Sequence, residues 1–588
     1  MYGNMGGFGG PTTRTQLDTL VESLTESDAD AVRDWLGGAN GQGMPGVLNP
    51  RALTQHHEAV ASDRRRPADD DPQGVRSVGV IGGGTAGFMA ALALKAKRPW
   101  LDVTLVQSKE IPIIGVGEAT VTYMVMFLHH YLGIDANELY RKVMPTWKLG
   151  IRFDWGPADD EPFMATFDWH HHSIGGLGAL DATGSVNGFT LQSLMMMADR
   201  SAVFEVDGKP VSLMKYLPFA YHLDNARFVG YLTELAEQRG IKHVEARLAD
   251  VVLGGEEWVD HLTTTDGREL KFDFYVDCTG FRSMLLGKTL GTPFHSYADT
   301  LFTNSAVTGN MPHDGVLKPY TSATTMQAGW TWNIPTPESD HIGYVYSTDH
   351  ISDEQAADEI KERFPTVDGL RQVRFRSGRH DKAWRGNVYA IGNSYAFVEP
   401  LESTGLLMSA LSIQAMVATL PTSWSETPAR DVVNLGLGQR WDAIRWFLGI
   451  HYKFNTKLDT PFWKDVRERC DVSGFKPLLD LYANGAPLTR RDPFLLDLAL
   501  GAAPTFFGLA GIDNLLLGQK VPATLLERTE TNDDWWQRRK AADALVAKAM
   551  TQADALKAFA EHPELNKQLL EDFDSWAGRH IAPYIGMN

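Results

Sequence analysis

The feature that most restricts the fold of this chain is a glycine-rich turn at residues 82–87, with the sequence Gly-Gly-Gly-Thr-Ala-Gly. Residues 75–81 before it are rich in β-branched side chains and predict a strand, and the alanine-rich residues 88–97 after it predict a helix. A second strand is predicted at residues 101–107. Strand, glycine turn, helix and strand within such a short segment are typical of the opening unit of a doubly wound dinucleotide-binding domain.

The turn matches the pattern G-x-G-x-x-G, in which each glycine has a separate task. Gly82 permits the tight turn, Gly84 lets the backbone approach a pyrophosphate, and Gly87 lets the helix pack closely on the strand. The backbone N–H groups at Thr85 and Ala86 then point at the anion from the helix N-terminus. An ordinary glycine turn is the alternative, and the flanking strand and helix argue against it.

Two further features indicate which dinucleotide binds. The second strand ends in Gln107, where such domains usually carry an Asp or Glu for the ribose hydroxyls, so the adenosine half has less support than the pyrophosphate. Asp277 follows a strand predicted at residues 272–276 and precedes a small turn, which is the form of a second flavin contact and favours FAD over NAD. Another strand is predicted at residues 387–390, and Gly392 after it is a further candidate cofactor contact.

The chain has 588 residues, 43% hydrophobic and 22% charged, which is enough for a large core and more than one structural unit. Residues 1–74 predict an N-terminal extension, with one amphipathic helix at residues 16–36 and a flexible linker. Residues 75–410 predict an FAD-binding and catalytic domain with substrate-region insertions, and residues 411–588 a helical region that caps the substrate. The expected fold class is therefore α/β: a doubly wound, Rossmann-like FAD-binding domain of the flavin monooxygenase type with a mostly helical C-terminal part.

Charge and cysteine content exclude several kinds of protein. The net charge of −18 argues against a nucleic-acid partner, because a phosphate backbone requires a surplus of Lys and Arg. Cys278 and Cys470 are far apart, so neither a disulfide framework nor a Cys-based zinc site is expected. The chain shows no signal-like N-terminal segment and no apolar run of about 18 residues. We therefore expect a cytoplasmic protein without a membrane span.

Three further motifs, taken together with the glycine turn, resemble those of the flavin-dependent tryptophan halogenases. They are Gly-Val-Gly-Glu-Ala-Thr at residues 115–120, Trp-Thr-Trp-Asn-Ile-Pro at residues 330–335 and Pro-Leu-Glu-Ser-Thr-Gly at residues 400–405. The second is the W-x-W-x-I-P element that separates these enzymes from ordinary flavin monooxygenases. Further matches extend the resemblance over about residues 76–470, at residues 147–153, 221–224 and 459–463.

The resemblance implies a halogenase in which FADH2, O2 and chloride or bromide yield hypohalous acid, which then halogenates an electron-rich aromatic ring. Lys148 corresponds to the residue that receives or hydrogen-bonds this oxidant, a task that suits an amine on a flexible stem. Glu402 corresponds to the acid that polarises the oxidant or stabilises the cationic ring intermediate. The backbone amides of Thr404 and Gly405 would hold the halide.

The same resemblance implies that Gly117 and Ala119 contact the flavin and that Trp330, Trp332 and Pro335 form a tunnel wall between flavin and substrate. The catalytic and wall residues each have a simpler interpretation when taken alone: a solvated lysine, an acid at a helix N-terminus, and tryptophans on the core face of a strand. Their joint occurrence, in the order found in the family, favours the functional interpretation.

Three adjacent histidines at residues 170–172 are a candidate metal site by composition alone. We expect no metal, because neighbouring residues of an extended chain point to opposite faces and no acidic partner stands at ligand spacing. By resemblance, His170 and His172 would instead flank the aromatic substrate, together with Phe462 and Trp463.

The sequence favours an indole within a peptide as the substrate. Family members that act on free tryptophan hold its charges with a Tyr-Tyr pair and a Glu, whereas residues 488–507 contain no Tyr and no Glu. A zwitterion bound there would leave its charges unpaired. We therefore expect a Trp-containing peptide, as in the lanthipeptide-tailoring members of the family, with residues 1–74 as a docking arm. A plain hydrophobic core helix is the alternative interpretation of residues 488–507.

Other functions stay open at this stage. They are halogenation of free tryptophan or another small aromatic, hydroxylation of an aromatic by a flavin monooxygenase, and peptide or partner binding by a degenerate flavin fold. A halogenase of this type also implies a separate NADH-dependent flavin reductase as a partner. A homodimer is compatible with the sequence, which determines neither the oligomeric state nor the ring position that is halogenated.

Overall fold

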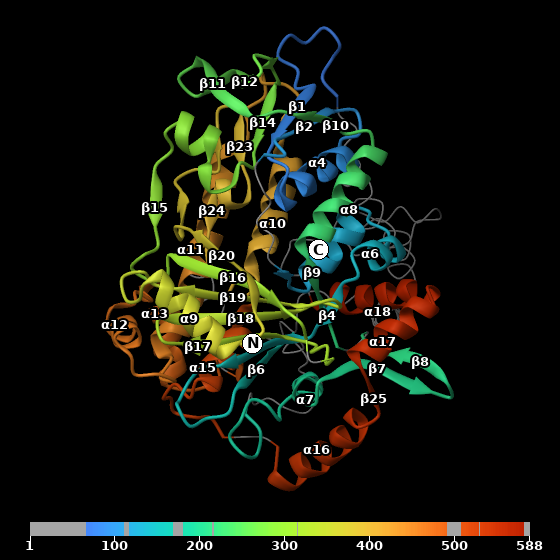
Figure 1. Ribbon diagram of the computed structural model, residues 1–588, viewed down its shortest axis with the longest axis vertical. Coiled ribbons are helices and arrows are strands. Elements are labelled where there is room, and N and C mark those ends of the chain that lie inside the picture. Colours follow the sequence, from blue (N-terminus) through green and yellow to red (C-terminus); the bar gives the residue numbers. More distant parts are fainter. Residues whose placement is uncertain are drawn as a thin grey trace, which may run out of the picture.

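The computed structural model describes residues 66–110, 117–167, 180–214, 217–313, 315–490, 507–527 and 530–580. The helix predicted at residues 16–36 and most of the N-terminal extension lie outside these described residues. Figure 1 shows a six-stranded sheet in the upper part of the molecule and a seven-stranded sheet across the middle, with most of the C-terminal helices beside and below the second sheet.

The six-stranded sheet has the parallel topology of a doubly wound cofactor-binding domain. Its strands, in spatial order, are β10 (Lys242–Glu245), β2 (Asp102–Gln107), β1 (Ser77–Ile81), β14 (Phe274–Asp277), β23 (Val388–Ala390) and β22 (Trp384–Arg385). All neighbouring pairs are parallel except β22 with β23. The four strands predicted for this domain are thus confirmed, with ends that differ by one or two residues.

Helix α4 (Thr85–Lys97) follows the glycine turn and begins three residues before the helix predicted at residues 88–97. The reason is that the Phe88 N–H already donates to the Gly84 carbonyl at 3.1 Å, as in a helical turn. Two helices from later in the chain, α8 (Asn225–Gln238) and α10 (Thr404–Thr419), pack against α4. Helix α10 thereby brings the segment before it, which contains the third motif, to the glycine turn.

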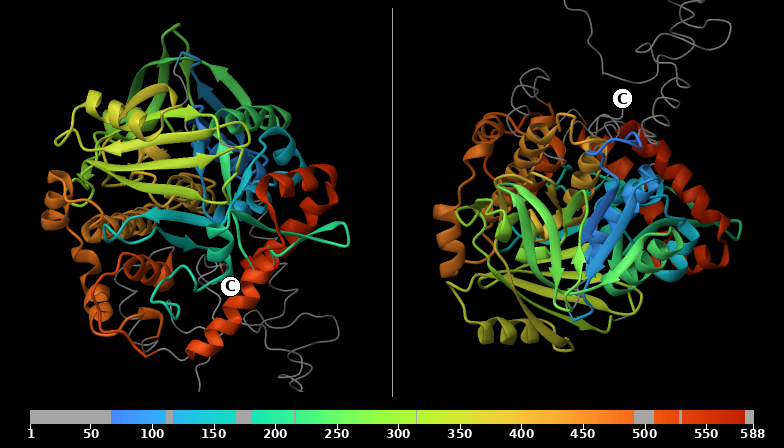
Figure 2. Two further views of the ribbon diagram at one scale, coloured as in Figure 1. Left: turned by 60° about the horizontal axis from the view of Figure 1, so that its bottom comes forward. Right: turned by 90° about the horizontal axis from the view of Figure 1, so that it is seen from above.

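The seven-stranded sheet forms the second layer, and its strands come from the predicted substrate region. In spatial order they are β20 (Asp368–Arg374), β16 (Ser305–Met311), β19 (Asp340–Tyr346), β18 (Gly329–Pro335), β17 (Thr321–Met326), β5 (Gly150–Asp154) and β6 (Phe163–Thr166). Only β17 and β5 pair in parallel. Figure 2 shows the yellow-green strands of this sheet running across the molecule, with orange helices beside them.

Small sheets connect these layers. One of them consists of β3 (Gly117–Ala119), β9 (Ala220–Asp224) and β4 (Thr146–Lys148), in that order. In its registers Ala119 lies opposite His222, and Lys148 lies opposite Ala220. The flavin motif and the predicted catalytic lysine are therefore held by the two sides of one central strand. The other small sheets are β11 (Leu248–Gly255), β12 (Trp258–Thr264) and β13 (Glu269–Leu270); β15 (Phe294–Ser296), β21 (Gly378–His380) and β24 (Ala396–Phe397); and β25 (Ala549–Thr551), β7 (Arg200–Val206) and β8 (Lys209–Ser212).

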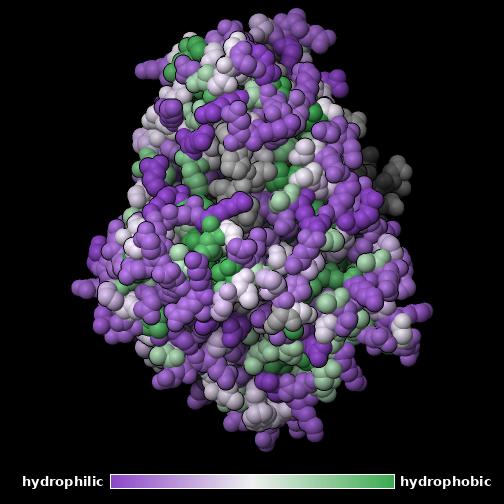
Figure 3. All heavy atoms as spheres, in the orientation of Figure 1, coloured by the Kyte–Doolittle hydropathy of each residue, from purple (hydrophilic) through white to green (hydrophobic). Residues whose placement is uncertain are grey.

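The described residues after 410 are mostly helical, as predicted, and β25 is the one strand assigned among them. The helices of this part are α11 (Arg430–Phe454), α12 (Pro461–Arg469), α13 (Lys476–Ala483), α15 (Gly508–Gly518), α16 (Asn532–Val546), α17 (Gln552–Glu561) and α18 (Glu564–His580). Across the described ranges, no helix has both the length and the apolar character that a bilayer span needs. Figure 3 shows a mainly hydrophilic face with hydrophobic residues in small separate groups.

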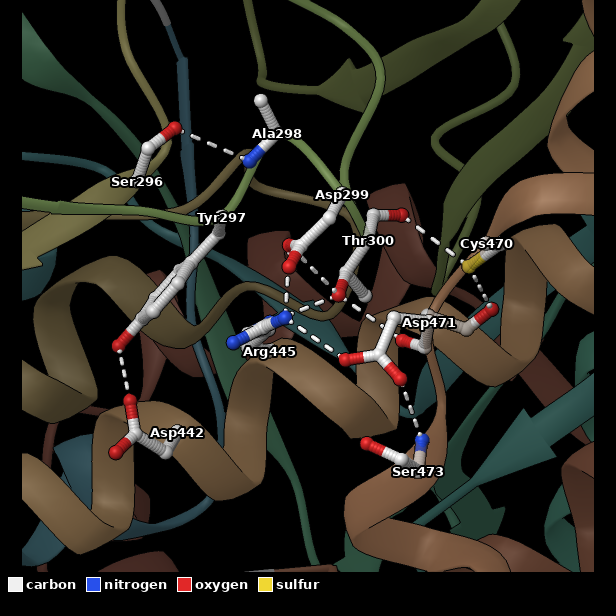
Figure 4. A network of polar contacts seen from close by, with 11 residues as sticks. Ser296, Tyr297, Ala298, Asp299, Thr300, Asp442, Arg445, Cys470, Asp471 and Ser473 are labelled. Atoms are coloured by element: carbon white, nitrogen blue, oxygen red, sulfur yellow. Dashed lines mark hydrogen bonds and ion pairs between the residues drawn. The ribbon is translucent and has the colours of Figure 1, made fainter.

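Helix α11 is tied to the rest of the fold through Arg445 (Figure 4). Its guanidinium donates to Asp299 at 2.7 Å, to Asp471 at 3.0 Å and to the Thr300 hydroxyl at 2.8 Å. One arginine therefore joins three chain segments: the loop after β15, helix α11 and the segment after α12. The Arg445 side chain is only 14% exposed, whereas Asp299 is 59% and Asp471 35% exposed, so water screens the Asp299 pair more than the Asp471 pair.

Replacing Arg445 with Met should lower the free energy of unfolding by about 2 kcal/mol, because two carboxylates and a hydroxyl lose their shared donor. Urea denaturation followed by circular dichroism measures this change. Lys476→Met is the matched control, since it removes an exposed pair with Asp480 within one helix and should cost about 0.5 kcal/mol or less. Equal losses in both variants would contradict the role given to Arg445.

Candidate active site

A cavity of about 1190 Å³ opens beside the glycine turn. Its walls combine residues from both ends of the cofactor-binding domain with residues from the seven-stranded sheet. The predicted cofactor residues that line it are Gly82, Gly84, Thr85, Ala86, Gln107, Gly117, Ala119 and Gly392. The structure thus brings eight scattered candidates to one surface, as expected of a site for a long ligand.

The absence of side chains at the glycines of this turn makes the turn suitable for the pyrophosphate of FAD. A Cβ added at Gly84 would meet nothing within 4 Å, so the backbone is bare towards the cavity. Gly82, at φ +124°, and Gly87 need glycine for packing, because an added Cβ would come within 2.1 Å of the Cys278 carbonyl and 1.9 Å of the Gly82 carbonyl. Helix α4 begins at Thr85, its N-cap residue Gly84 supplies no side-chain cap, and Thr85 and Ala86 line the cavity, so its first N–H groups are available to an anion.

Two predicted cofactor residues have additional structural roles. Gln107 lies against the turn, since a Cβ at Gly83 would come within 1.6 Å of its Oε1. Asp277 is buried and accepts hydrogen bonds from the backbone N–H groups of Leu285 and Leu286, both at 2.9 Å. Its carboxylate therefore anchors the segment after β14, whose Cys278 and Gly280 line the cavity. A direct contact of Asp277 with a cofactor stays a prediction.

Lys148 is completely buried at the end of β4. Its Nζ donates to the Ser403 hydroxyl at 2.7 Å and to the Thr120 carbonyl at 3.0 Å, and it lies 5.5 Å from the ring of Phe167. Burial lowers the pKa of this amine to about 7, and the charge of Glu402 acts in the opposite direction. The amine can therefore lose and regain its proton much closer to neutral pH than an ordinary lysine. A solvated lysine, the simpler interpretation, is wrong.

Ser403 connects Lys148 to the cavity. It has the left-handed backbone conformation, φ 58° and ψ 34°, which is uncommon for a residue with a side chain. Ser403 is the residue directly before α10. Its hydroxyl accepts a hydrogen bond from Lys148, and the residue also lines the cavity. Strain of this kind is concentrated at functional sites. The sequence contained Ser403 within the third motif, but no feature of the sequence singled it out.

Glu402, the second predicted catalytic residue, is 6% exposed and contacts a histidine that sequence reasoning missed. His451, on α11, places Nε2 at 2.7 Å from Oε1 of Glu402 and Nδ1 at 2.9 Å from the Phe447 carbonyl. Glu402 lies just before α10, where an acid could interact with the helix N-terminus. Its carboxylate instead contacts His451 of helix α11. No sequence motif linked these two residues, which are 49 positions apart.

The W-x-W-x-I-P motif forms strand β18, with its two tryptophans on the same face at 5.9 Å between ring centroids. Trp332 lines the cavity, whereas Trp330 lies behind it and donates its indole N–H to Glu399 at 3.3 Å. Glu399 is fully buried, and this burial raises its pKa to about 7. The Pro335 carbonyl accepts from the Thr146 hydroxyl at 2.8 Å, which fixes the end of β18 beside β4.

The predicted halide residues lie at the N-terminus of α10. Gly405 lines the cavity and leaves open space where a side chain would stand. Thr404 is fully buried, and its hydroxyl has no hydrogen-bond partner among the described residues. A bare helix N-terminus with an unsatisfied hydroxyl is chemically suited to a small anion.

The predicted substrate residues are only partly covered by the structure. Phe462 and Trp463 are buried where α11 packs on α12, and the Trp463 indole donates to the Met326 carbonyl at 2.8 Å. They do not line the cavity, and their contact with a substrate stays a prediction. His170 and His172 lie outside the described residues, as does most of residues 488–507. The described ranges contain no group of three or more His, Cys, Asp or Glu placed to hold a metal ion.

This fold and cavity define a flavoprotein of the FAD-binding α/β class. A sequence model of the tryptophan halogenase family matches residues 77–526. The chain therefore belongs to the flavin-dependent tryptophan halogenases, and it is an oxidoreductase of that type.

Individual relatives agree with this assignment. The crystal structure of MibH, a lanthipeptide tryptophan 5-halogenase, is 62% identical, with a TM-score of 0.84 over 87% of this chain and 98% of MibH. The tryptophan 6-halogenase SttH from Streptomyces toxytricini is 29% identical, with a TM-score of 0.72 over 82% of this chain and 100% of SttH. The 7-chloro-L-tryptophan 6-halogenase KtzR from Kutzneria sp. (strain 744) is 34% identical over 70% of this chain and 86% of KtzR.

Burial of the Lys148 amine predicts a pH-dependent loss of stability. Its pKa of about 7 in the folded protein lies below the usual 10.5, so folding releases a proton between these two values. The loss is complete below about pH 7 and disappears as the pH rises towards 10.5. Between about pH 6.5 and about pH 9, the free energy of unfolding of the wild type should therefore rise by about 2 kcal/mol relative to Lys148→Met.

Urea denaturation at both pH values measures this difference. Lys464→Met, which removes an exposed lysine, should stay parallel to the wild type over the same range. If Lys148→Met is also parallel to the wild type, the amine is not buried as described.

Proposed function

We propose that this chain halogenates the indole of a tryptophan within a peptide, using FADH2, O2 and chloride or bromide. The observation that carries the proposal is the buried Lys148 amine, bound to Ser403 at the edge of the cofactor cavity and influenced by the charge of Glu402. A lysine without a carboxylate hydrogen-bonded to it is expensive to bury, so a chemical role explains its presence.

Different residues of the chain would bind the cofactor, the halide and the oxidant. Gly82, Gly84, Thr85 and Ala86 would hold the pyrophosphate of FAD, which supplies hypohalous acid from O2 and halide when it is bound and reduced. The backbone N–H groups at Thr404 and Gly405, with the Thr404 hydroxyl, would bind the halide at the N-terminus of α10. Lys148 would then receive or hydrogen-bond the hypohalous acid and hold it for the substrate.

Glu402 would polarise the hypohalous acid and stabilise the positive charge that develops on the ring. Its low exposure strengthens both effects, because water screens little of the interaction. Trp330, Trp332 and Pro335 would separate substrate from cofactor, so that oxygen is not transferred directly to the ring. The hydrogen bond from Trp330 to Glu399 supports a rigid wall.

The peptide substrate is supported by two observations. Residues 488–507 contain neither the tyrosines nor the glutamate that would hold a free amino acid. The relative with 62% identity, MibH, is a lanthipeptide tryptophan 5-halogenase, whereas the 7-chloro-L-tryptophan 6-halogenase KtzR and the tryptophan 6-halogenase SttH are 34% and 29% identical. We also propose a separate NADH-dependent flavin reductase as a partner, and residues 1–74 as a docking arm for the peptide.

Replacing Lys148 with Met should abolish halogenation, with kcat lower by at least about 10²-fold, while the oxidation of reduced flavin continues. Product is measured by mass spectrometry through the halogen isotope pattern, and flavin oxidation by absorbance. Lys464→Met is the control and should keep both activities. An oxygenated product from either protein would instead indicate a flavin monooxygenase, and bound FAD without any product would indicate a binding protein.

The substrate is tested by comparing a lanthipeptide that carries one tryptophan with free tryptophan, each with enzyme, FAD, a flavin reductase, NADH and chloride or bromide. We expect kcat/KM to be at least about tenfold higher for the peptide, because free tryptophan brings unpaired charges into the site. The same peptide with Phe in place of Trp should stay unmodified. Equal rates for peptide and free tryptophan would contradict the peptide substrate.

A further inference from the structure

The contact between Glu402 and His451 requires a proton that neither residue carries in its ordinary form at neutral pH. The Phe447 carbonyl is only an acceptor, so Nδ1 of His451 must carry a hydrogen to bind it at 2.9 Å. In a neutral imidazole Nε2 is then bare, and it would face an ionised carboxylate oxygen at 2.7 Å with two lone pairs in opposition. A stable contact at this distance therefore needs one proton between Nε2 and Oε1.

The surroundings favour retention of this proton. His451 is fully buried among aromatic rings, with centroids at 5.2 Å for Phe447, 5.3 Å for Phe153 and 6.1 Å for Trp155. Loss of the proton would leave a single negative charge on a pair that water barely reaches, which is costly. With the proton, the pair is neutral overall, whether the proton lies nearer nitrogen or oxygen.

We infer that His451 is the positioning residue for Glu402, and that the two side chains share one proton and work as a unit in halogenation. The role of the pair in halogenation rests on the proposed function, whereas the shared proton does not. His451 occupies Oε1, which leaves Oε2 of Glu402 as the oxygen that can touch the reacting groups. The aromatic rings around His451 fix the imidazole, and the imidazole fixes the carboxyl group.

With Oε1 held by the shared proton, Oε2 of Glu402 has two successive tasks. As the ring π electrons form the carbon–halogen bond, the halogen–oxygen bond of hypohalous acid breaks and the oxygen departs as hydroxide, while Oε2 stabilises the cationic ring. The ring C–H bond then breaks, its electron pair returns to the π system, and Oε2 takes the proton and passes it to the hydroxide, which leaves as water. Hypohalous acid and the arene thus become haloarene and water, and the shared proton stays between Nε2 and Oε1 throughout.

The first experiment measures the proton directly and needs no substrate. Protein labelled with 15N-histidine and 13C-glutamate is examined by NMR near pH 7, with Glu402→Gln and His451→Gln used to assign the signals. We expect either a doubly protonated His451 or a protonated Glu402. In Glu402→Gln, His451 should become an ordinary neutral imidazole. A neutral His451 with a bare Nε2 beside an ionised Glu402 in the wild type would overturn the inference, whatever the reaction turns out to be.

The second experiment tests the role in halogenation. His451→Phe fills the aromatic pocket but cannot hold Oε1, and it should lower kcat by about 10²-fold with KM changed by less than about twofold. His451→Gln can still donate an N–H to Glu402, so it should recover to within about tenfold of the wild type. Flavin oxidation should be unaffected in both, which shows that the fold and the cofactor site are intact.

His129 provides a matched control because it is a buried histidine whose two ring nitrogens are held at distances similar to those of His451. It is buried, with Nδ1 at 2.8 Å from the Ile134 carbonyl and Nε2 at 3.0 Å from the Tyr221 hydroxyl. His129→Gln should keep kcat within about twofold of the wild type. If its loss equals that of His451→Phe, the effect is general core damage and the inference fails. If the wild type itself makes no halogenated product, the proposed function fails while the NMR result still stands.

Discussion

The rest of the site depends on the burial of one amine. Lys148 has no water to solvate it, so its nitrogen must be bound by the protein, and the partners are the Ser403 hydroxyl and the Thr120 carbonyl. These come from segments that are far apart in the chain. Holding them around one nitrogen fixes the small sheet of β3, β9 and β4 against the N-terminus of α10, and therefore against the cofactor cavity.

The segment before α10 is the second point on which the structure depends, because three of its polar side chains bind three different elements. Glu399 accepts from Trp330 of β18, Glu402 contacts His451 of α11, and Ser403 accepts from Lys148 of β4. Each of these side chains is buried, so an unpaired one would be costly. The wall, the helical cap and the catalytic lysine are in this way aligned with one another by a single short stretch of chain.

Much of this arrangement could be predicted from local sequence. The glycine turn, the flanking strands and the helix follow from steric rules that act over a few residues, and the structure places them within one or two residues at most strand ends. Lys148 and Glu402 could be named because they occur in motifs. His451 and Glu399 could not be assigned a role in this way, since their importance lies in contacts across space: the Glu402–His451 pair spans 49 positions and the Trp330–Glu399 pair spans 69.

By itself, the sequence determined the cofactor-binding fold, the family and the residues that could carry the chemistry, because each depends on short-range backbone geometry or on motifs in a fixed order. The tertiary structure alone decided which of those residues are buried, which share a cavity, and which partners hold them. The lowered pKa of Lys148 shows the difference. A lysine in a short polar-apolar stretch is ordinarily solvated, and only the packing of β4, α10 and the loop at Thr120 removes the water that would keep its pKa near the usual value.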